Sequence, residues 1–202
     1  MSGPAPNAHS PDGAEPPSAW VRRWSHLVVP SGVVLDVACG QGRHARWFYE
    51  RNHAVVLVDR SQAAIESIAT IIPARCCEAV VADIENGPWP FSGRQFDAVI
   101  VTNYLWRPLL PTLIGSLAPG GVLIYETFTQ GNETVGKPSR PDFLLRPGEL
   151  LEVCRALRVV AFEDGFDSGP SGRTPRFVQR IAAVRESAAI DPAGGAVRYP
   201  LL

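Results

Sequence analysis

An acidic residue stands just before two glycines in VVLDVACGQGRHA, residues 33–45. Asp36 precedes Gly40 by four residues, and Gly42 follows at the spacing of a glycine-rich turn. Such a turn brings backbone N–H groups close to a ligand, and the helix that starts beside it attracts anions. A carboxylate at the same place repels a pyrophosphate and attracts a cation. The segment therefore favours a cofactor with an ammonium and a sulfonium, such as S-adenosylmethionine.

The same turn also satisfies the dinucleotide-binding pattern GxGxxG/A, with Gly40, Gly42 and Ala45 in its three fixed positions. Asp59 follows Gly42 by seventeen residues, near the spacing of the acid that binds the ribose of NAD. An NAD site is therefore an alternative. Asp59 and Asp83 each end an apolar run, AVVLV and EAVVA, and so stand where the strands of an open α/β sheet end and ligands bind.

The elements that must position these residues alternate between apolar runs and amphipathic segments. Strands are predicted over 33–38, 54–59, 78–83, 96–103, 122–128, 158–164 and 176–184. Helices are predicted over 43–52, over 61–72 with Ser61 as cap, from 108 to a stop at Gly120–Gly121, and over 148–157. Apolar strands that alternate with helices indicate a doubly wound α/β fold, with a mostly parallel seven-stranded sheet. Only a loop joins the last two strands, so they should form an antiparallel edge hairpin.

Composition limits the kind of protein. The chain has 202 residues, 46% of them hydrophobic, and a formal net charge of −1. This is enough for one domain, predicted over residues 18–185, between a disordered tail at 1–17 and a C-terminal tail at 186–202. The near-neutral charge argues against a nucleic-acid partner. Four cysteines without metal-ligand spacing, no signal peptide and no membrane span predict a cytoplasmic protein without a metal.

The motif D-x-A-C-G-x-G, the acids that close the second and third strands, the segment PGGVLIYE (119–126) and the closing hairpin resemble class I S-adenosylmethionine-dependent methyltransferases. Ala38 stands where the first glycine of that loop is often found. The motifs CGQGR, PGELL and VVAFED are similar to those of the tellurite-resistance and thiopurine-type methyltransferases, which act on small soft nucleophiles or anions. The loop GFDSGPSGRTPR lacks the histidine of the tellurite enzymes.

The resemblance implies a role for each matching residue. Asp36 orients the methionine end of S-adenosylmethionine, Asp59 accepts from the ribose, and Asp83 accepts from the adenine amino group with Ile84 against the ring. The implied cofactor-binding residues are Asp36, Ala38, Gly40, Gly42, Asp59, Arg60, Asp83, Ile84, Asn103 and Tyr104. The candidate acceptor-binding residues are Arg43, Trp106, Arg107, Phe128, Arg140, Arg146 and Arg173. No catalytic base is identified, since methyl transfer to a good nucleophile needs mainly alignment and exclusion of water.

The acceptor is predicted to be a small molecule with an anionic or soft nucleophile. The segment 127–147 is long for a strand-to-helix connection and carries Arg140 and Arg146 beside aromatic residues, which suggests a lid over an anionic group. Residues 103–108, NYLWRP, lack the paired prolines of methyltransferases that act on nucleobase amino groups. The alternatives are an RNA or protein methyltransferase, an NAD-dependent oxidoreductase and a non-enzymatic cofactor-binding scaffold.

Overall fold

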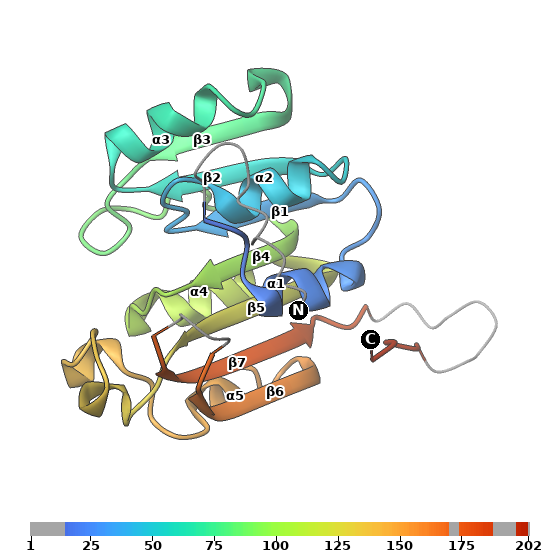
Figure 1. Ribbon diagram of the computed structural model, residues 1–202. Coiled ribbons are helices and arrows are strands. Elements are labelled where there is room, and N and C mark those ends of the chain that lie inside the picture. Colours follow the sequence, from blue (N-terminus) through green and yellow to red (C-terminus); the bar gives the residue numbers. More distant parts are fainter. Residues whose placement is uncertain (1–14, 170–173, 188–196, 202) are drawn as a thin grey trace, which may run out of the picture.

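A computed structural model describes residues 15–169, 174–187 and 197–201, so Arg173 and most of both predicted tails lie outside it. A seven-stranded sheet crosses the molecule in the order β3-β2-β1-β4-β5-β7-β6 (Figure 1). The strands are β1 (Val33–Val37), β2 (Ala54–Asp59), β3 (Cys77–Val81), β4 (Phe96–Thr102), β5 (Leu117–Phe128), β6 (Arg158–Asp167) and β7 (Arg176–Val184). The first five are parallel, and β7 runs antiparallel between β5 and β6. The predicted fold class is confirmed.

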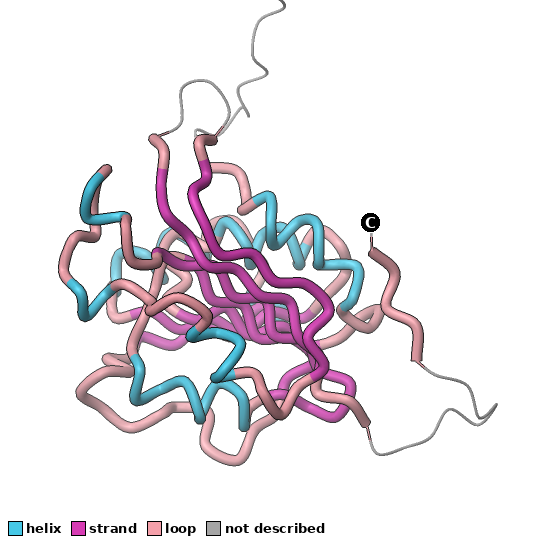
Figure 2. Tube along the Cα trace, turned by 90° about the horizontal axis from the view of Figure 1, so that it is seen from below, coloured by secondary structure: helices cyan, strands magenta, loops and turns pink. Residues whose placement is uncertain are grey.

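Helices cover both faces of the sheet (Figure 2). On one face lie α1 (Ala19–Trp24), α2 (Arg43–Tyr49) and α3 (Gln62–Ala69), and on the other lie α4 (Leu110–Gly115) and α5 (Glu149–Val153). Neighbouring strand residues point to opposite faces, so Val34 packs with the first group and Leu35 with the second. Short 3-10 helices occupy Ser25–Leu27, Ala74–Cys76, Arg107–Leu109, Asn132–Thr134 and Pro141–Phe143.

Helix α1 is part of the core rather than a cover over a ligand. Trp20 and Trp24 are buried and meet edge to face, with ring centroids 5.6 Å apart. The Trp20 indole Nε1 donates to the backbone oxygen of Ile181 in β7 at 3.2 Å. Ser18 caps the helix by accepting from the backbone N–H groups of Trp20 and Val21. The chain therefore enters the fold across the ends of β5 and β7.

Several predicted boundaries differ from the structure: α2, α3 and α5 are shorter than predicted, and β5 and β6 are longer. The helix after β4 ends at Gly115, not at Gly120–Gly121, because the chain returns to the sheet at Leu117 and pairs with Phe96. An ideal Cβ on Gly121 would lie 2.8 Å from the Phe96 carbonyl oxygen, so the glycine permits a close approach of two strands. Strand β3 ends at Val81, which places Asp83 in the following loop.

Among the described residues, no helix has both the length and the apolar content that a membrane crossing requires.

Candidate functional site

The loop after β1 has a backbone path that glycine permits. Ala38, Gly40 and Gly42 have φ angles of +52°, +52° and +72°, all in the left-handed region. An ideal Cβ on Gly42 would lie 2.8 Å from Cγ1 of Ile68, so this glycine lets α2 begin against α3. An ideal Cβ on Gly40 would have no heavy atom of the described residues within 4 Å, apart from its chain neighbours. The loop can therefore present its backbone to a ligand at Gly40.

Asp59 joins the end of β2 to this loop. Its Oδ2 accepts from the Gly40 N–H at 2.9 Å, and its Oδ1 accepts from the Ser61 N–H at 2.8 Å. Each carboxylate oxygen has two acceptor sites, so Asp59 can accept further hydrogen bonds from a ligand. Ser61 in turn caps α3 through a hydrogen bond from the Ala64 N–H. The carboxylate is thus held in one orientation before any ligand binds.

Asp59 forms one wall of a cavity of about 240 Å³ at the ends of β1, β2 and β4. The sequence predicted six of its lining residues, and the structure brings them together: Ala38, Asp59, Arg60, Asp83, Ile84 and Tyr104. Ala82 and Glu85 also line the cavity, as does Phe143 from the segment between β5 and α5. The cavity thus combines carboxylates with an aromatic and aliphatic surface, which suits a nucleoside.

Two polar side chains in this cavity, Asp83 and Tyr104, can form hydrogen bonds with a ligand. The Asp83 carboxylate accepts from Asn86 and from two backbone N–H groups, and the Asn86 side chain contributes most to lowering its pKa. It therefore stays an ionised acceptor. The Tyr104 hydroxyl is buried and lies beside the Glu85 carboxylate. Burial, the charge of Glu85 and a hydrogen bond to its carboxylate raise the pKa of Tyr104, so the hydroxyl keeps its proton at neutral pH.

Two further cavities continue along the strand ends. The second, of about 340 Å³, shares Ala38 with the first and is lined by Cys39, Gly40, Gln41, His44 and Thr102 together with Glu15, Arg43 and Asn103. The third, of about 320 Å³, shares Glu15, Arg43 and Asn103 with the second and adds Ser18, Glu126, Thr174 and Arg176. The three cavities form a row across the carboxyl ends of the parallel strands, where open α/β sheets bind ligands.

Asp36 does not line this row. It is 2% exposed, and its Oδ2 accepts from the Ala45 N–H in the first turn of α2 at 3.2 Å. Burial is the main cause that raises its pKa to about 8, although the Ala45 hydrogen bond and Arg43 act in the opposite direction. Because the group is mostly protonated at neutral pH, it does not present to a cofactor the negative charge that the sequence argument assigned to it.

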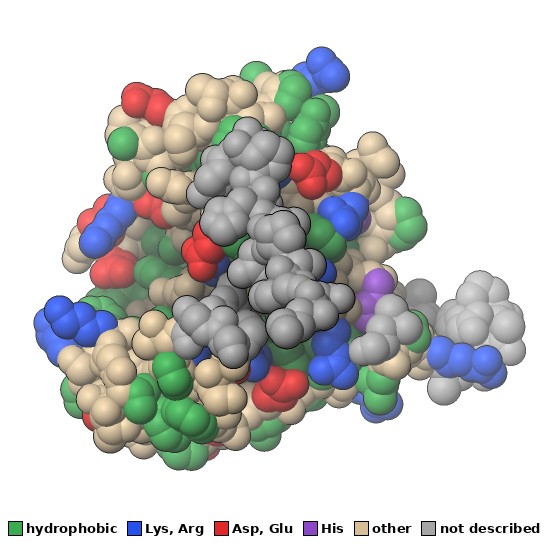
Figure 3. Space-filling view, viewed as in Figure 1, with side chains coloured by type: hydrophobic (Ala, Val, Ile, Leu, Met, Phe, Trp, Pro, Cys, Tyr) green, Lys and Arg blue, Asp and Glu red, His purple; other side chains and the backbone are tan. Residues whose placement is uncertain are grey.

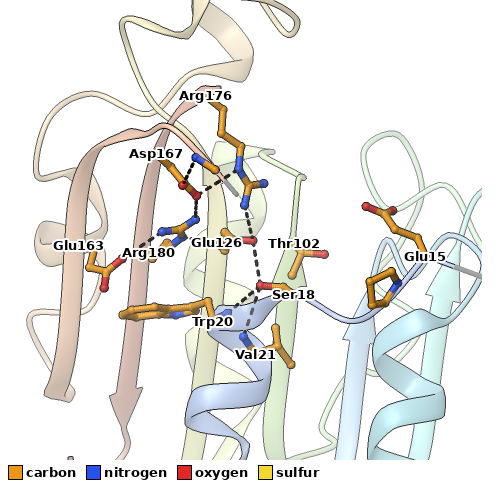
Figure 4. A network of polar contacts seen from close by, with 12 residues as sticks. Glu15, Ser18, Trp20, Val21, Thr102, Glu126, Glu163, Asp167, Arg176 and Arg180 are labelled. Carbon is orange, nitrogen blue, oxygen red and sulfur yellow. Dashed lines mark hydrogen bonds and ion pairs between the residues drawn. The ribbon is translucent and has the colours of Figure 1, made fainter. Parts of the chain in front are cut away.

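A buried polar network beside the third cavity was not predicted (Figure 4). Glu126, 1% exposed within β5, accepts from the Ser18 hydroxyl at 3.0 Å and from Nε of Arg180. The Ser18 N–H also donates to Nε2 of His44 at 3.2 Å, and burial lowers the pKa of His44 to about 3, so that ring is neutral. An acid in the apolar run VLIYETF was the sequence signal for this network.

The candidate acceptor residues do not converge on one pocket. Arg43 lines the second and third cavities, but Trp106, Arg107, Phe128, Arg140 and Arg146 line none of the three. Arg107 holds the lid segment: it donates to both oxygens of Glu149 and to the backbone oxygens of Asp142 and Leu144. The exposed Arg140 and Arg146 pair with acidic neighbours.

Comparisons with known proteins agree with this geometry. Residues 34–121 match a family model described as a methyltransferase domain. A search of curated proteins finds no match. TehB from Haemophilus influenzae is similar in structure, with a TM-score of 0.67 and 16% identity; the match covers 80% of this chain and 60% of that one.

Two other solved structures are similar over most of their length. The glycopeptide N-methyltransferase MtfA, in complex with S-adenosylmethionine, has a TM-score of 0.59 and 21% identity, over 90% of this chain and 99% of that chain. The N-methyltransferase NodS from Bradyrhizobium japonicum has a TM-score of 0.59 and 17% identity, and the match covers 80% of this chain and 93% of that chain. At these identities the likeness shows a shared fold, which is that of class I methyltransferases.

Proposed function

We propose that this chain, whose residues 34–121 match a family model described as a methyltransferase domain, transfers the methyl group of S-adenosylmethionine to a small acceptor with an anionic or soft nucleophile. When bound, that cofactor supplies an electrophilic methyl group on a sulfonium. The single observation that carries the proposal is the row of three cavities. The first is lined by carboxylates and suits a nucleoside, the second contains the open space at Gly40, and the third is lined by two arginines.

The residues fit the cofactor in order along the row. Asp59 accepts hydrogen bonds from the ribose, and Asp83 accepts from the adenine amino group while Ile84 packs on the ring. The Tyr104 hydroxyl, which lies beside Glu85, is a further polar group in the same cavity. Beyond the nucleoside, the open space at Gly40 receives the methionine portion. Asn103, whose φ of +53° turns the chain at the end of β4, borders both the second and third cavities, where the methyl group and the acceptor meet.

Size and charge support a small acceptor. The third cavity, at about 320 Å³, lies in the range of small-molecule sites. On the face seen in Figure 3, lysine and arginine side chains stand in separate groups among acidic ones, and the net charge is −1. A polynucleotide backbone is held by many basic contacts, which a continuous stripe provides. A small acceptor needs only one or two guanidinium groups, and Arg43 is placed to supply one.

Calorimetric titration with S-adenosylhomocysteine, NAD and NADP tests the cofactor. We expect micromolar binding of S-adenosylhomocysteine alone. Asp59→Asn should weaken it about tenfold, in line with the loss of hydrogen bonds to a charged group. Glu50→Gln removes an exposed charge at the end of α2 and serves as the matched control. Tighter binding of NAD than of S-adenosylhomocysteine would replace the proposal with an oxidoreductase.

Transfer of labelled methyl groups to a panel tests the acceptor class. The panel contains small thiols, thiopurines, selenite, tellurite, aromatic acids and bulk RNA. We expect label on small anionic or thiol acceptors only. Labelled RNA alone, with a yield that falls steeply as salt is added, would overturn the small-acceptor proposal because that salt dependence is typical of phosphate contacts.

A further inference from the structure

Four charged side chains line the third cavity: Glu15, Arg43, Glu126 and Arg176. They come from the chain before α1, the start of α2, β5 and β7. Their formal charges cancel. Which of these charges are fixed, and which are free to exchange partners, decides what the cavity can bind.

Arg180 fixes the acids on the sheet side of the cavity. Its Nε donates to Glu126, its Nη2 donates to Asp167, and its Nη1 donates to Glu163 at 3.0 Å. The three nitrogens of this guanidinium are thus bound by three carboxylates, as Figure 4 shows. The Ser18 hydroxyl supplies a further hydrogen bond to Glu126. Glu126 is therefore a satisfied, immobile acid in the floor of the cavity.

Arg176 has hydrogen-bonding capacity left. Its Nη2 lies 3.5 Å from Oε1 of Glu126 and its Nε lies 3.7 Å from Oδ2 of Asp167. These are ion-pair distances, and among the described residues no hydrogen bond from the guanidinium accompanies them. The side chain is 23% exposed, so the two acids orient Arg176 while its N–H groups remain available toward the cavity.

Arg43 already holds a carboxylate. Its Nη1 lies 2.8 Å from Oε2 of Glu15, and Arg43 is only 16% exposed while Glu15 is 69% exposed. The chain is anchored three residues later, where Ser18 is bound to His44 and Glu126. Glu15 is therefore a solvent-facing group three residues before that anchor, and water competes for its carboxylate, so its pairing with Arg43 contributes little to stability. Another carboxylate can replace it at little cost.

We propose that the third cavity binds the carboxylate of a small organic acid, which displaces Glu15 and accepts hydrogen bonds from Arg43 and Arg176. Glu126 is already bound by Arg180, so loss of Glu15 from the wall frees the Arg43 guanidinium for the carboxylate of the ligand. At about 320 Å³ the cavity is far larger than an inorganic oxyanion and fits an aromatic or short aliphatic acid. This inference rests on the proposed function for the identity of the neighbouring cofactor, and it names the class of acceptor.

Binding of paired probes tests the inference. Benzoate, salicylate and anthranilate are titrated into protein saturated with S-adenosylhomocysteine, each beside its neutral amide. We expect each acid to bind more tightly than its amide. Glu15→Gln should strengthen acid binding about five- to tenfold, because the competing carboxylate is gone, and should leave amide binding unchanged. Glu50→Gln makes the same change in net charge away from the cavity and should have no effect.

Substitutions of Arg176 should weaken acid binding, whereas Glu15→Gln should strengthen it. Arg176→Gln should weaken acid binding at least tenfold, and Arg176→Lys, which keeps the positive charge, should weaken it less. If no acid binds more tightly than its amide, or if Glu15→Gln and Arg176→Gln leave acid binding unchanged, the inference is wrong. Binding of S-adenosylhomocysteine is measured first in each protein. Its absence from the wild type would count against the proposed function, whereas failure of the acids alone would count only against the organic-acid site.

Discussion

Arg107 and Glu149 form a bidentate ion pair that ties the segment after β4 to the first turn of α5. The distances are 2.7 Å from Nε to Oε1 and 3.0 Å from Nη2 to Oε2, and Glu149 is 4% exposed. The same guanidinium donates to the backbone oxygens of Asp142 and Leu144, the residues on either side of Phe143. A buried carboxylate and a lid are thus held by one side chain. The segment predicted to bind the acceptor is therefore fixed beside the first cavity, which Phe143 lines.

Arg107→Ala should both destabilise the fold and weaken cofactor binding. Removing the guanidinium leaves Glu149 buried without its main partner, and because Arg107 is itself 36% exposed we expect a loss of about 1–3 kcal/mol, at the lower end for buried pairs. Urea denaturation measures this loss, and calorimetry with S-adenosylhomocysteine measures the effect on binding. Arg140→Ala is the control, since its pair with Asp142 is 72% exposed on both sides and should change stability by less than about 0.5 kcal/mol.

Gly40→Ala and Gly42→Ala should separate ligand binding from stability. Both residues have positive φ, so each substitution carries strain of about 1 kcal/mol. At Gly42 the new methyl group also displaces the buried Ile68, and we expect a total loss of about 2–3 kcal/mol. At Gly40 the methyl group enters the open space of the second cavity, so affinity for S-adenosylhomocysteine should fall at least tenfold. Denaturation and calorimetry on both variants check this contrast, and equal effects at the two positions would contradict it.

Asp36 should make stability fall as pH rises. Its pKa in the folded protein is about 8, against an ordinary value of 3.8. Between these values the unfolded chain has released a proton that the folded chain keeps, so a higher pH favours unfolding. The contribution is fully present below about pH 4 and is lost as the pH approaches 8. Asp36→Asn stays neutral, and its stability relative to the wild type should rise across this range by on the order of 1–4 kcal/mol.

Thermal or urea denaturation at pH 5, 6, 7 and 8 measures this difference. Groups other than Asp36 titrate alike in both proteins, so the difference between the two curves isolates this residue. A constant gap between wild type and Asp36→Asn would show that Asp36 is already ionised at pH 5.

The sequence predicted the order and type of the strands because apolar runs such as VVLDV and AVVLVD fit only a sheet buried on both faces. The end residues were harder: Gly120 and Gly121 look like a helix stop, yet their lack of side chains serves a close approach of β5 to β4. Asp59, Asp83 and Tyr104 were placed together correctly because parallel strands end at one edge. Local sequence patterns were therefore enough to predict which residues meet where the order of the strands alone brings those residues together.

The acceptor side could not be predicted in the same way. Glu126, Arg176 and Ser18 meet there from segments more than a hundred residues apart at the extremes, so their contact depends on tertiary packing. Arg107 was assigned to the acceptor because it follows β4, but its donors are taken by Glu149 and by lid carbonyls. Which arginine is bound internally and which remains available depends on partners that no spacing rule identifies.

Phe143 should contribute to cofactor affinity through the nucleoside alone. Its ring lines the cavity that Asp59 and Asp83 also line, is 41% exposed, and comes from the segment that Arg107 holds. Stacking of a base on an aromatic side chain contributes about 1–3 kcal/mol, so Phe143→Ala should weaken S-adenosylhomocysteine binding about 5- to 150-fold. Because the ring is exposed before a ligand binds, the unliganded protein should keep its melting temperature.

Calorimetry should show that adenosine loses affinity for Phe143→Ala by the same factor, while homocysteine binding is unchanged. Phe166→Ala removes a ring that is 54% exposed on β6, outside this cavity, and should change neither. Equal losses for adenosine and homocysteine would instead assign Phe143 a general role in the shape of the site.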